Sequence, residues 1–289
     1  MKTKTIKLAI QKEGRLAEGS LLLLRKSGLD FECYSRQLLC PCQNFPLDIL
    51  FVRDDDIAGY VESGVADLGI LGQNILYESR PQVKKLLNLQ FGRCALTLSV
   101  PKDSQISDLK DLKKRTIATS YPNSVRAFLE KNRIESNILT ISGSVEIAPT
   151  LGIADVIADL LSSGSTLKMN DLKPLQTIYK SEAILIGNRN QNGTSDSYAQ
   201  IRTLLQRIES VLSAKNYKNI SMEIPVNNLM RVRKLLGGIK GSIQTSQTSS
   251  DTAVLQTVIT QDRLWETVEK LKAFGVSNIF VTPVENIIS

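Results

Sequence analysis

Histidine is absent from the 289 residues of this chain. Without imidazole, the chain has no histidine general base, no histidine metal ligand and no Ser–His or Cys–His nucleophile. Aromatic residues are also scarce, at 5%, and no zinc-finger or RNP pattern is present, so the aromatic stacking surfaces of nucleic-acid-binding modules are missing. The chemistry of this protein therefore rests on carboxylates, hydroxyls, cations and backbone groups.

Long apolar runs are missing too, and none approaches the length of a membrane span. The first residues, MKTKTIKLAIQKEGRL, lack the apolar core of a signal peptide because Gln11, Lys12 and Glu13 interrupt it. We therefore expect a cytoplasmic protein with no membrane partner. The 42% of hydrophobic and 22% of charged residues are ordinary for globular proteins, and the length allows two or three domains.

Cysteine is limited to Cys33, Cys40, Cys42 and Cys94. The spacing of Cys40 and Cys42 is not that of a zinc C-x-x-C pair, and no histidine completes a ligand set. Because disulfides are rare in cytosolic proteins, we expect four reduced thiols.

Positive charge is in excess, with a formal net charge of +7. Such a charge attracts polyanions, but it is scattered along the chain, and the longest basic run is only residues 113–115. Two phosphorylated small molecules account for the charge as well as nucleic acid does, and so does an ordinary solvated basic surface. With so few aromatic residues, we expect no nucleic-acid partner.

The most informative segment is Ser144–Leu167, where an apolar strand-like run leads into a loop of small residues. Asp155 and Asp159 lie four residues apart in that run and so share one face. The loop offers backbone N–H groups, hydroxyls and one glycine to a negatively charged group. It consists of Ser162, Ser163, Gly164, Ser165 and Thr166. An empty turn before a helix has a similar composition, because Ser and Thr favour turns and caps for local reasons.

Together these residues resemble the signature of the ATP phosphoribosyltransferases. The matching positions are Glu146, Ala148, Pro149, Gly152, Ala154, Asp155, Asp159, Gly164, Thr166, Leu167 and Asn170. Three further blocks are similar to that family: LAIQKEGRL (8–16), RDDDIAGYVESGVADLGILGQN (53–74) and RTIATSYPNSV (115–125). The stretch LWETVEKLKAFGVSNIFVTPVENI (264–287) resembles the regulatory domain of the long-form enzymes.

Strands and helices alternate along the chain, which indicates an α/β protein. The resemblance implies a two-lobed, periplasmic-binding-protein-like catalytic core, with lobe I formed by residues 1–97 and 182–219 and lobe II by residues 98–181. The pattern over residues 220–289 is β-α-β-β-α-β, which is ferredoxin-like topology. The resemblance implies that this last domain is regulatory.

The resemblance implies that the enzyme transfers the 5-phosphoribosyl group of phosphoribosyl pyrophosphate to N1 of ATP, releasing pyrophosphate, as the first step of histidine biosynthesis. Positive charge develops on the sugar, so the protein mainly positions two substrates and stabilises the leaving group. Mg²⁺ would bridge the pyrophosphate oxygens while keeping waters. The resemblance also implies inhibition by histidine and a homo-oligomer in which hexamers exchange with dimers.

Four residues are predicted to be catalytic. Asp155 and Asp159 would lie near the ribose hydroxyls or the metal, with Asp159 as the metal ligand. Lys12 and Arg15 would meet the pyrophosphate or the ATP phosphates, although ordinary solvent exposure also explains them. Glu13 departs from the family turn, which often has a small residue between lysine and glycine.

The predicted binding residues fall into three groups. Those for the sugar phosphate are Ser162, Ser163, Gly164, Ser165 and Thr166, supported by Glu146. Those for ATP are Asp67, Leu68 and Gly69 from one lobe and Ser120 and Tyr121 from the other, with packing as an equal explanation for Tyr121. Those for histidine are Glu223, Ser242 and Ser277, at edges of the last domain.

Two other classes of function share this architecture. A solute-binding or effector-sensing module would have the same two lobes. It would normally lack the acidic strand with its Ser-Gly-Ser-Thr loop, and it would bring a signal peptide or a DNA-binding arm. A catalytically inactive regulatory subunit is the other alternative, and the presence of Asp159, Gly164 and Thr166 argues against it.

Overall fold

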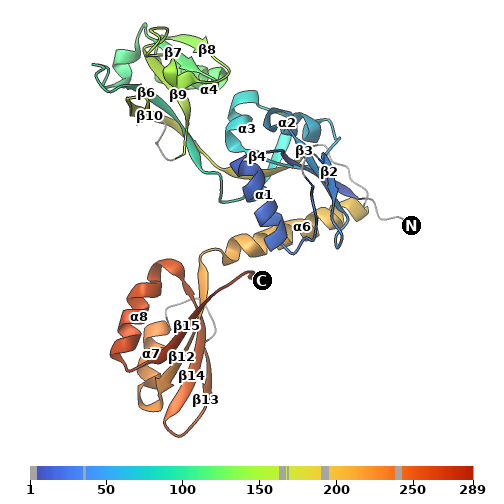
Figure 1. The fold of residues 1–289 in the computed structure, drawn as a ribbon, viewed down its shortest axis with the longest axis vertical. Helices are drawn as coiled ribbons and strands as arrows, with labels where there is room; N and C mark the ends of the chain where they lie inside the picture. Colours follow the sequence, from blue (N-terminus) through green and yellow to red (C-terminus); the bar gives the residue numbers. More distant parts are fainter. Residues whose placement is uncertain are drawn as a thin grey trace. The chain divides into compact units, whose positions relative to one another are not determined.

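The computed structural model describes residues 5–34, 37–162, 167, 169–189, 195–237 and 243–288. The chain divides into two compact units, Met1–Arg202 and Thr203–Ser289 (Figure 1). No helix within the described part of the chain is long and apolar enough to cross a membrane.

The first sheet of the first unit has six strands in the order β2-β3-β1-β4-β11-β5. Its strands are β1 (Ile6–Gln11), β2 (Leu39–Pro41), β3 (Leu47–Val52), β4 (Leu68–Gly72), β5 (Val83–Asn88) and β11 (Ala183–Asn188). β1, β3 and β4 run parallel, and each leads into a helix: α1 (Arg15–Lys26), α2 (Asp54–Glu62) and α3 (Gln73–Ser79). The central strands are almost wholly buried, as expected for a parallel sheet covered on both faces.

The second sheet has five strands in the order β10-β6-β9-β7-β8. Its elements are β6 (Cys94–Pro101), η1 (Leu109–Leu112), β7 (Thr116–Thr119), α4 (Pro122–Asn132), β8 (Asn137–Thr140), η2 (Val145–Ile147), β9 (Val156–Leu161) and β10 (Leu172–Ser181). β7, β8 and β9 run parallel, so their carboxyl ends lie at one edge.

The chain crosses between the two sheets at two paired strands. Cys94, at the start of β6, pairs with Ser181, at the end of β10, and β11 then returns to the first sheet. Two α/β lobes joined in this way confirm the expected periplasmic-binding-protein-like core. The predicted lobe boundaries at residues 97 and 182 stay predictions.

The second unit is a four-stranded antiparallel sheet with the order β13-β14-β12-β15. Its elements follow α6 (Ser195–Ala214), which spans the boundary between the units. They are β12 (Tyr217–Pro225), η3 (Val226–Asn228), α7 (Leu229–Leu236), β13 (Gln244–Gln247), β14 (Thr252–Thr260), η4 (Gln261–Arg263), α8 (Leu264–Ala273) and β15 (Ser277–Pro283). Helices α7 and α8 bury Val232, Leu236, Val268 and Leu271 in the core that the sheet also lines. This arrangement confirms the predicted ferredoxin-like topology.

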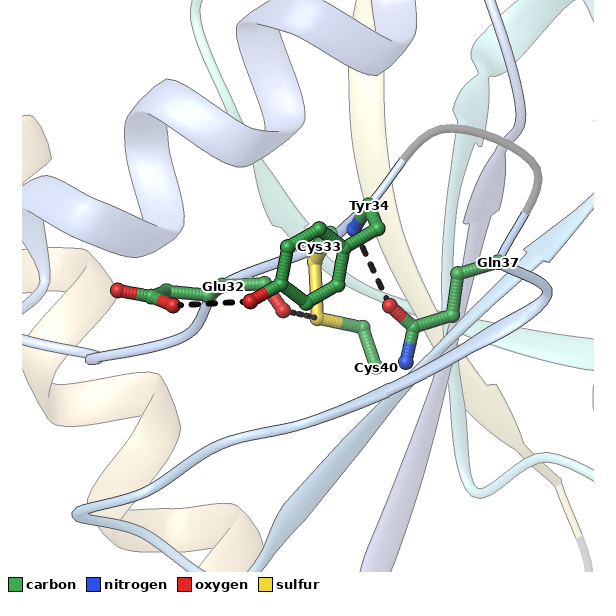
Figure 2. The surroundings of a disulfide bond; sticks show 5 residues. All are labelled: Glu32, Cys33, Tyr34, Gln37 and Cys40. Atoms are coloured by element: carbon green, nitrogen blue, oxygen red, sulfur yellow. Dashed lines mark hydrogen bonds between the residues drawn. A yellow bond between two sulfur atoms is a disulfide. The ribbon is translucent and has the colours of Figure 1, made fainter.

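A disulfide joins Cys33 and Cys40, so the expectation of four reduced thiols is wrong (Figure 2). The segment after α1 runs back along β2, where the N–H of Gln43 donates to the carbonyl of Asp30 at 2.8 Å. This return brings the two cysteines to a Cα–Cα distance of 5.5 Å. Cellular compartment and cysteine spacing carry no information about such a tertiary contact.

The other two cysteines are free thiols. Burial raises the pKa of Cys42 to about 11, and the negative charges of Asp48 and Asp30 act in the same direction. Burial also raises the pKa of Cys94. Both thiols are therefore protonated and weakly nucleophilic at neutral pH.

We expect reduction of the Cys33–Cys40 disulfide to lower the free energy of unfolding by about 2 to 3 kcal/mol, since a closed loop of this length restricts the unfolded chain. Urea unfolding with and without a dithiol reductant measures the change. The Cys42→Ala variant, which keeps the disulfide, is the control and should respond to reductant as the native protein does. Thiol titration of the denatured protein should find two thiols before reduction and four after it, and four thiols at the outset would contradict the disulfide.

Candidate functional site

The carboxyl ends of β7 and β9 come together at one edge of the second sheet. Thr119 pairs with Ala158, and its Oγ1 donates to the carbonyl of Ala158 at 2.7 Å. The same Oγ1 accepts the N–H of Tyr121 at 2.9 Å. Ser120 lies between them, and its Oγ donates to the carbonyl of Ile141 at 2.7 Å. Ser120 and Tyr121 are therefore held firmly at this edge.

Asp159 lies in β9 just before the same edge, and its side chain is half-buried. The N–H of Leu160 donates to its Oδ1 at 2.8 Å. Burial raises the pKa of Asp159, and the negative charge of Glu146 raises it further. A carboxylate that has lost part of its hydration favours a cation or a hydroxyl donor, and perturbed groups of this kind are common at functional sites.

Tyr121 and Glu146 interact electrostatically with this carboxylate. Burial raises the pKa of Tyr121, and the charge of Asp159 raises it further, so the phenol stays protonated at neutral pH and can donate a hydrogen bond. Glu146 is half-buried in η2. The structure thus brings Glu146 and Tyr121 each within electrostatic reach of Asp159.

The predicted phosphate loop begins at this edge. Ser162 is exposed immediately after β9. Ser163, Gly164, Ser165 and Thr166 lie outside the described residues. Leu167, on the far side of the loop, is buried against a core cluster that includes Ala118 and Ile157, so the two ends of the loop are anchored to the second lobe.

Asp155 is not part of this group. It precedes β9 at the opposite end of the strand, about 13 Å from Asp159, because each strand residue advances roughly 3.3 Å. The guanidinium of Arg115 donates to its Oδ1 at 3.2 Å, and the N–H of Thr116 donates to its Oδ2 at 2.9 Å. The spacing of four residues therefore did not place the two carboxylates at one site. Asp155 instead joins the start of β7 to the start of β9.

Lys12 and Arg15 lie at the carboxyl edge of the first sheet. The N–H of Lys12 donates to the carbonyl of Val52 at 2.9 Å, which joins the ends of β1 and β3. Gly14 then adopts φ +93°, a conformation that favours glycine, and α1 begins at Arg15. Both cationic side chains are exposed, and within the described residues neither forms an ion pair.

The structure does not bring Asp67, Leu68 and Gly69 to that edge. They lie at the start of β4, where Asp67 Oδ2 accepts the N–H of Lys7 at 2.8 Å and Leu68 is fully buried. A Cβ on Gly69 would come 2.7 Å from Cγ2 of Ile57 and 2.9 Å from Cγ2 of Val61. The small residue at position 69 therefore allows α2 to pack on β4 and does not open a path for a ligand.

We expect Gly69→Ala to lower the free energy of unfolding by about 1 to 3 kcal/mol, because the added methyl group overpacks the contact between β4 and α2. Gly59→Ala is the matched control, since a Cβ at Gly59 meets nothing within 4 Å. Alanine there should be neutral or stabilise the helix by up to about 1 kcal/mol. Equal effects of the two substitutions on chemical unfolding would refute the packing explanation.

In the second unit, two of the predicted histidine-sensing residues are neighbours. Glu223 in β12 pairs with Ser277 at the start of β15. Nδ2 of Asn278 donates to Oε2 of Glu223 at 2.8 Å. Ser242 lies outside the described residues.

The donor set for a metal ion is sparse. Within the residues that the structure describes, no group of three or more His, Cys, Asp or Glu side chains could hold an ion. The three acids Asp54, Asp55 and Asp56 do not form such a group. They open α2 and complement its dipole. A single half-buried carboxylate such as Asp159 still fits Mg²⁺, which usually keeps several waters and binds through one or two carboxylates plus substrate phosphates.

Comparisons with known proteins identify the family. The family model described as ATP phosphoribosyltransferase matches residues 53–210, and the model described as HisG, C-terminal domain, matches residues 214–286. The ATP phosphoribosyltransferase of Phocaeicola vulgatus is 40% identical over 283 residues, which are 98% of this chain and 99% of that protein. This chain belongs to the ATP phosphoribosyltransferase family. Its members are pentosyltransferases that catalyse the first step of histidine biosynthesis.

Further relatives agree with this ATP phosphoribosyltransferase assignment. The ATP phosphoribosyltransferase of Cytophaga hutchinsonii is also 40% identical over 283 residues, covering 98% of each chain. A solved chain from the ATP phosphoribosyl transferase (HisG:HisZ) complex of Thermotoga maritima is 29% identical, with a TM-score of 0.61. That match covers 71% of this chain and 96% of the solved one.

Proposed function

We propose that this protein transfers the 5-phosphoribosyl group of phosphoribosyl pyrophosphate to N1 of ATP and releases pyrophosphate, with histidine as a feedback inhibitor. The observation that carries the proposal is the grouping of Asp159, Glu146 and Tyr121 at the end of β9, where the predicted phosphate loop, residues 162–166, begins. Membership of the family supplies the class of reaction.

The second lobe would hold the phosphoribosyl group. The loop Ser162–Thr166 has the composition to bind the 5-phosphate through backbone N–H groups and hydroxyls. Asp159 would accept hydrogen bonds from the ribose hydroxyls or from water on Mg²⁺. Bound Mg²⁺ would neutralise pyrophosphate charge, with Asp159 as the carboxylate best placed to hold it.

The charged side chains at the edges of the two lobes are complementary to the charges that develop in the reaction. When the bond at C1 of the ribose breaks, positive charge appears on the sugar and negative charge on the pyrophosphate. Asp159 and Glu146 stabilise the first, and the exposed cations Lys12 and Arg15 stabilise the second. Tyr121, protonated beside Asp159, donates a hydrogen bond at the boundary between them.

Regulation would belong to the second unit. We place the histidine site at the edge formed by Glu223 and Ser277, and we keep Ser242, which lies outside the described residues, as a further candidate. The Glu223 carboxylate suits the amino group of an amino acid, although it already accepts a hydrogen bond from Asn278. We further propose a cytoplasmic homo-oligomer, in which hexamers exchange with dimers.

The two aspartates of the signature provide a direct test. We expect Asp159→Asn to lower kcat/KM by about 100-fold or more, as the loss of one preorganised electrostatic group does. Asp155→Asn should keep activity within about threefold and lower the melting temperature, because its partners Arg115 and Thr116 are structural. The assay follows phosphoribosyl-ATP formation by ultraviolet absorbance with ATP, phosphoribosyl pyrophosphate and Mg²⁺, with and without histidine.

A native protein that is folded, binds either substrate and forms no product would refute the transferase proposal and favour a binding module or regulatory subunit. Loss of activity in Asp155→Asn but not in Asp159→Asn would refute the assignment of roles.

Asp159 should also give a stability effect that depends on pH. Its pKa is raised in the folded protein, so ionisation of Asp159 destabilises the fold above that pKa, and the penalty disappears as the pH falls below it. We therefore expect Asp159→Asn to be more stable than the native protein at neutral pH, with a gain that shrinks in acid. Thermal unfolding of both proteins across this range measures it, and a gain that grew in acid would contradict the raised pKa.

A further inference from the structure

The first turn of α4 lacks acceptors of its own for two backbone N–H groups. Pro122 occupies its first position and has no N–H, and Val125 donates to the carbonyl of Tyr121. The N–H groups of Asn123 and Ser124 are therefore left without a partner inside the helix. Tyr121, at the N-cap, provides no side-chain cap.

Glu78 supplies both missing acceptors. The N–H of Asn123 donates to its Oε1 at 2.9 Å, and the N–H of Ser124 donates to its Oε2 at 2.9 Å. Nδ2 of Asn123 also donates to the backbone carbonyl of Glu78 at 3.1 Å. A carboxylate at this position satisfies the first turn and complements the helix dipole.

This cap comes from the other lobe. Glu78 is near the end of α3, which follows β4 of the first sheet, whereas α4 follows β7 of the second. The three hydrogen bonds therefore form only when the two lobes are placed as they are here. The hydrogen bonds that cap α4 are therefore the same ones that link the two lobes.

The neighbouring residues extend this junction to β10, one of the two paired strands that join the lobes. Oγ of Ser124 lies 3.3 Å from the hydroxyl of Tyr179, and the rings of Tyr179 and Tyr77 have centroids 4.6 Å apart. Burial raises the pKa of Tyr179 to about 12, with Glu78 adding to the shift. A groove of about 500 Å³ between α3, α4 and β10 adjoins these contacts, so the packing around them is incomplete.

The junction adjoins the proposed site directly. Tyr121 immediately precedes Pro122, so it lies two residues from the first N–H that Glu78 holds. The negative charge of Asp54, in the first lobe, acts on Tyr121 as well. We infer that Glu78 is a positioning residue, which fixes the Tyr121 and Asp159 half of the site against the Lys12 and Arg15 half. This inference rests on the proposed function.

The variants must separate a lost helix cap from lost lobe placement. Glu78→Ala removes both the cap of α4 and the link between the lobes. Glu78→Ala with Asn123→Asp restores a carboxylate to the first turn of α4 from within the second lobe, but restores no link to the first. Glu62→Ala is the matched control, because Glu62 also accepts a backbone N–H, that of Gln82 at 3.1 Å, but inside the first lobe.

We expect Glu78→Ala to lower kcat at least tenfold while the Kd of phosphoribosyl pyrophosphate, measured by calorimetry, changes less than threefold, because the second lobe would bind it. The double variant should recover most of the lost melting temperature but not the lost kcat. Glu62→Ala should keep kcat within twofold. Recovery of kcat in the double variant, or a kcat within twofold of native in Glu78→Ala, would overturn the inference.

A readout without catalysis separates this inference from the proposed reaction. Spin labels carried by noncanonical residues at Glu18 and Lys113, both exposed and one in each lobe, report the distance between the lobes. We expect a broader distance distribution in both Glu78 variants than in the native and Glu62→Ala proteins. If the native protein forms no product, the proposed function fails, and the distance measurement alone decides whether Glu78 fixes the placement of the lobes. Identical distributions would then reject the role of Glu78.

Discussion

The register of β9 against β7 is the constraint on which the site depends. Thr119 pairs with Ala158, and Asp155 accepts the N–H of Thr116 at the start of the same pair of strands. With both ends of the pairing held, Asp159 has one available position, beside the turn that carries Tyr121. Sliding β9 by one residue would turn Asp159 to the other face of the sheet. The position of this carboxylate is thus a consequence of backbone pairing.

The two lobes carry complementary charges. The second lobe places two partly desolvated carboxylates at its edge, and the first lobe places two exposed cations after β1. In the proposed reaction, which separates positive charge on a sugar from negative charge on pyrophosphate, neither half would be sufficient alone. The contact of Glu78 with α4 matters for this reason, because it joins the halves at the residue next to Tyr121.

Several features were predictable because they depend on local pattern. The alternation of strands and helices, the ferredoxin-like order of the last domain and the resemblance to the family follow from residue order. Asp159 and Glu146 were also recognised as candidates, from the segment that contains the phosphate loop, and Tyr121 was recognised as a candidate for ATP binding. Periodicity did not distinguish Asp155 from Asp159, and only the pairing with β7 shows which of them reaches the carboxyl edge.

What the sequence alone determined is the class of fold, the family and the chemical types available at the site, because apolar spacing, turn residues and signature motifs are local properties of the chain. The tertiary structure decided which of those residues meet. It packed Gly69 against α2, joined Cys33 to Cys40, and brought Glu78 to an α-helix that begins 44 residues later. These contacts depend on how lobes and strands pack, and packing brings together residues whose separation along the chain carries no signal of their contact.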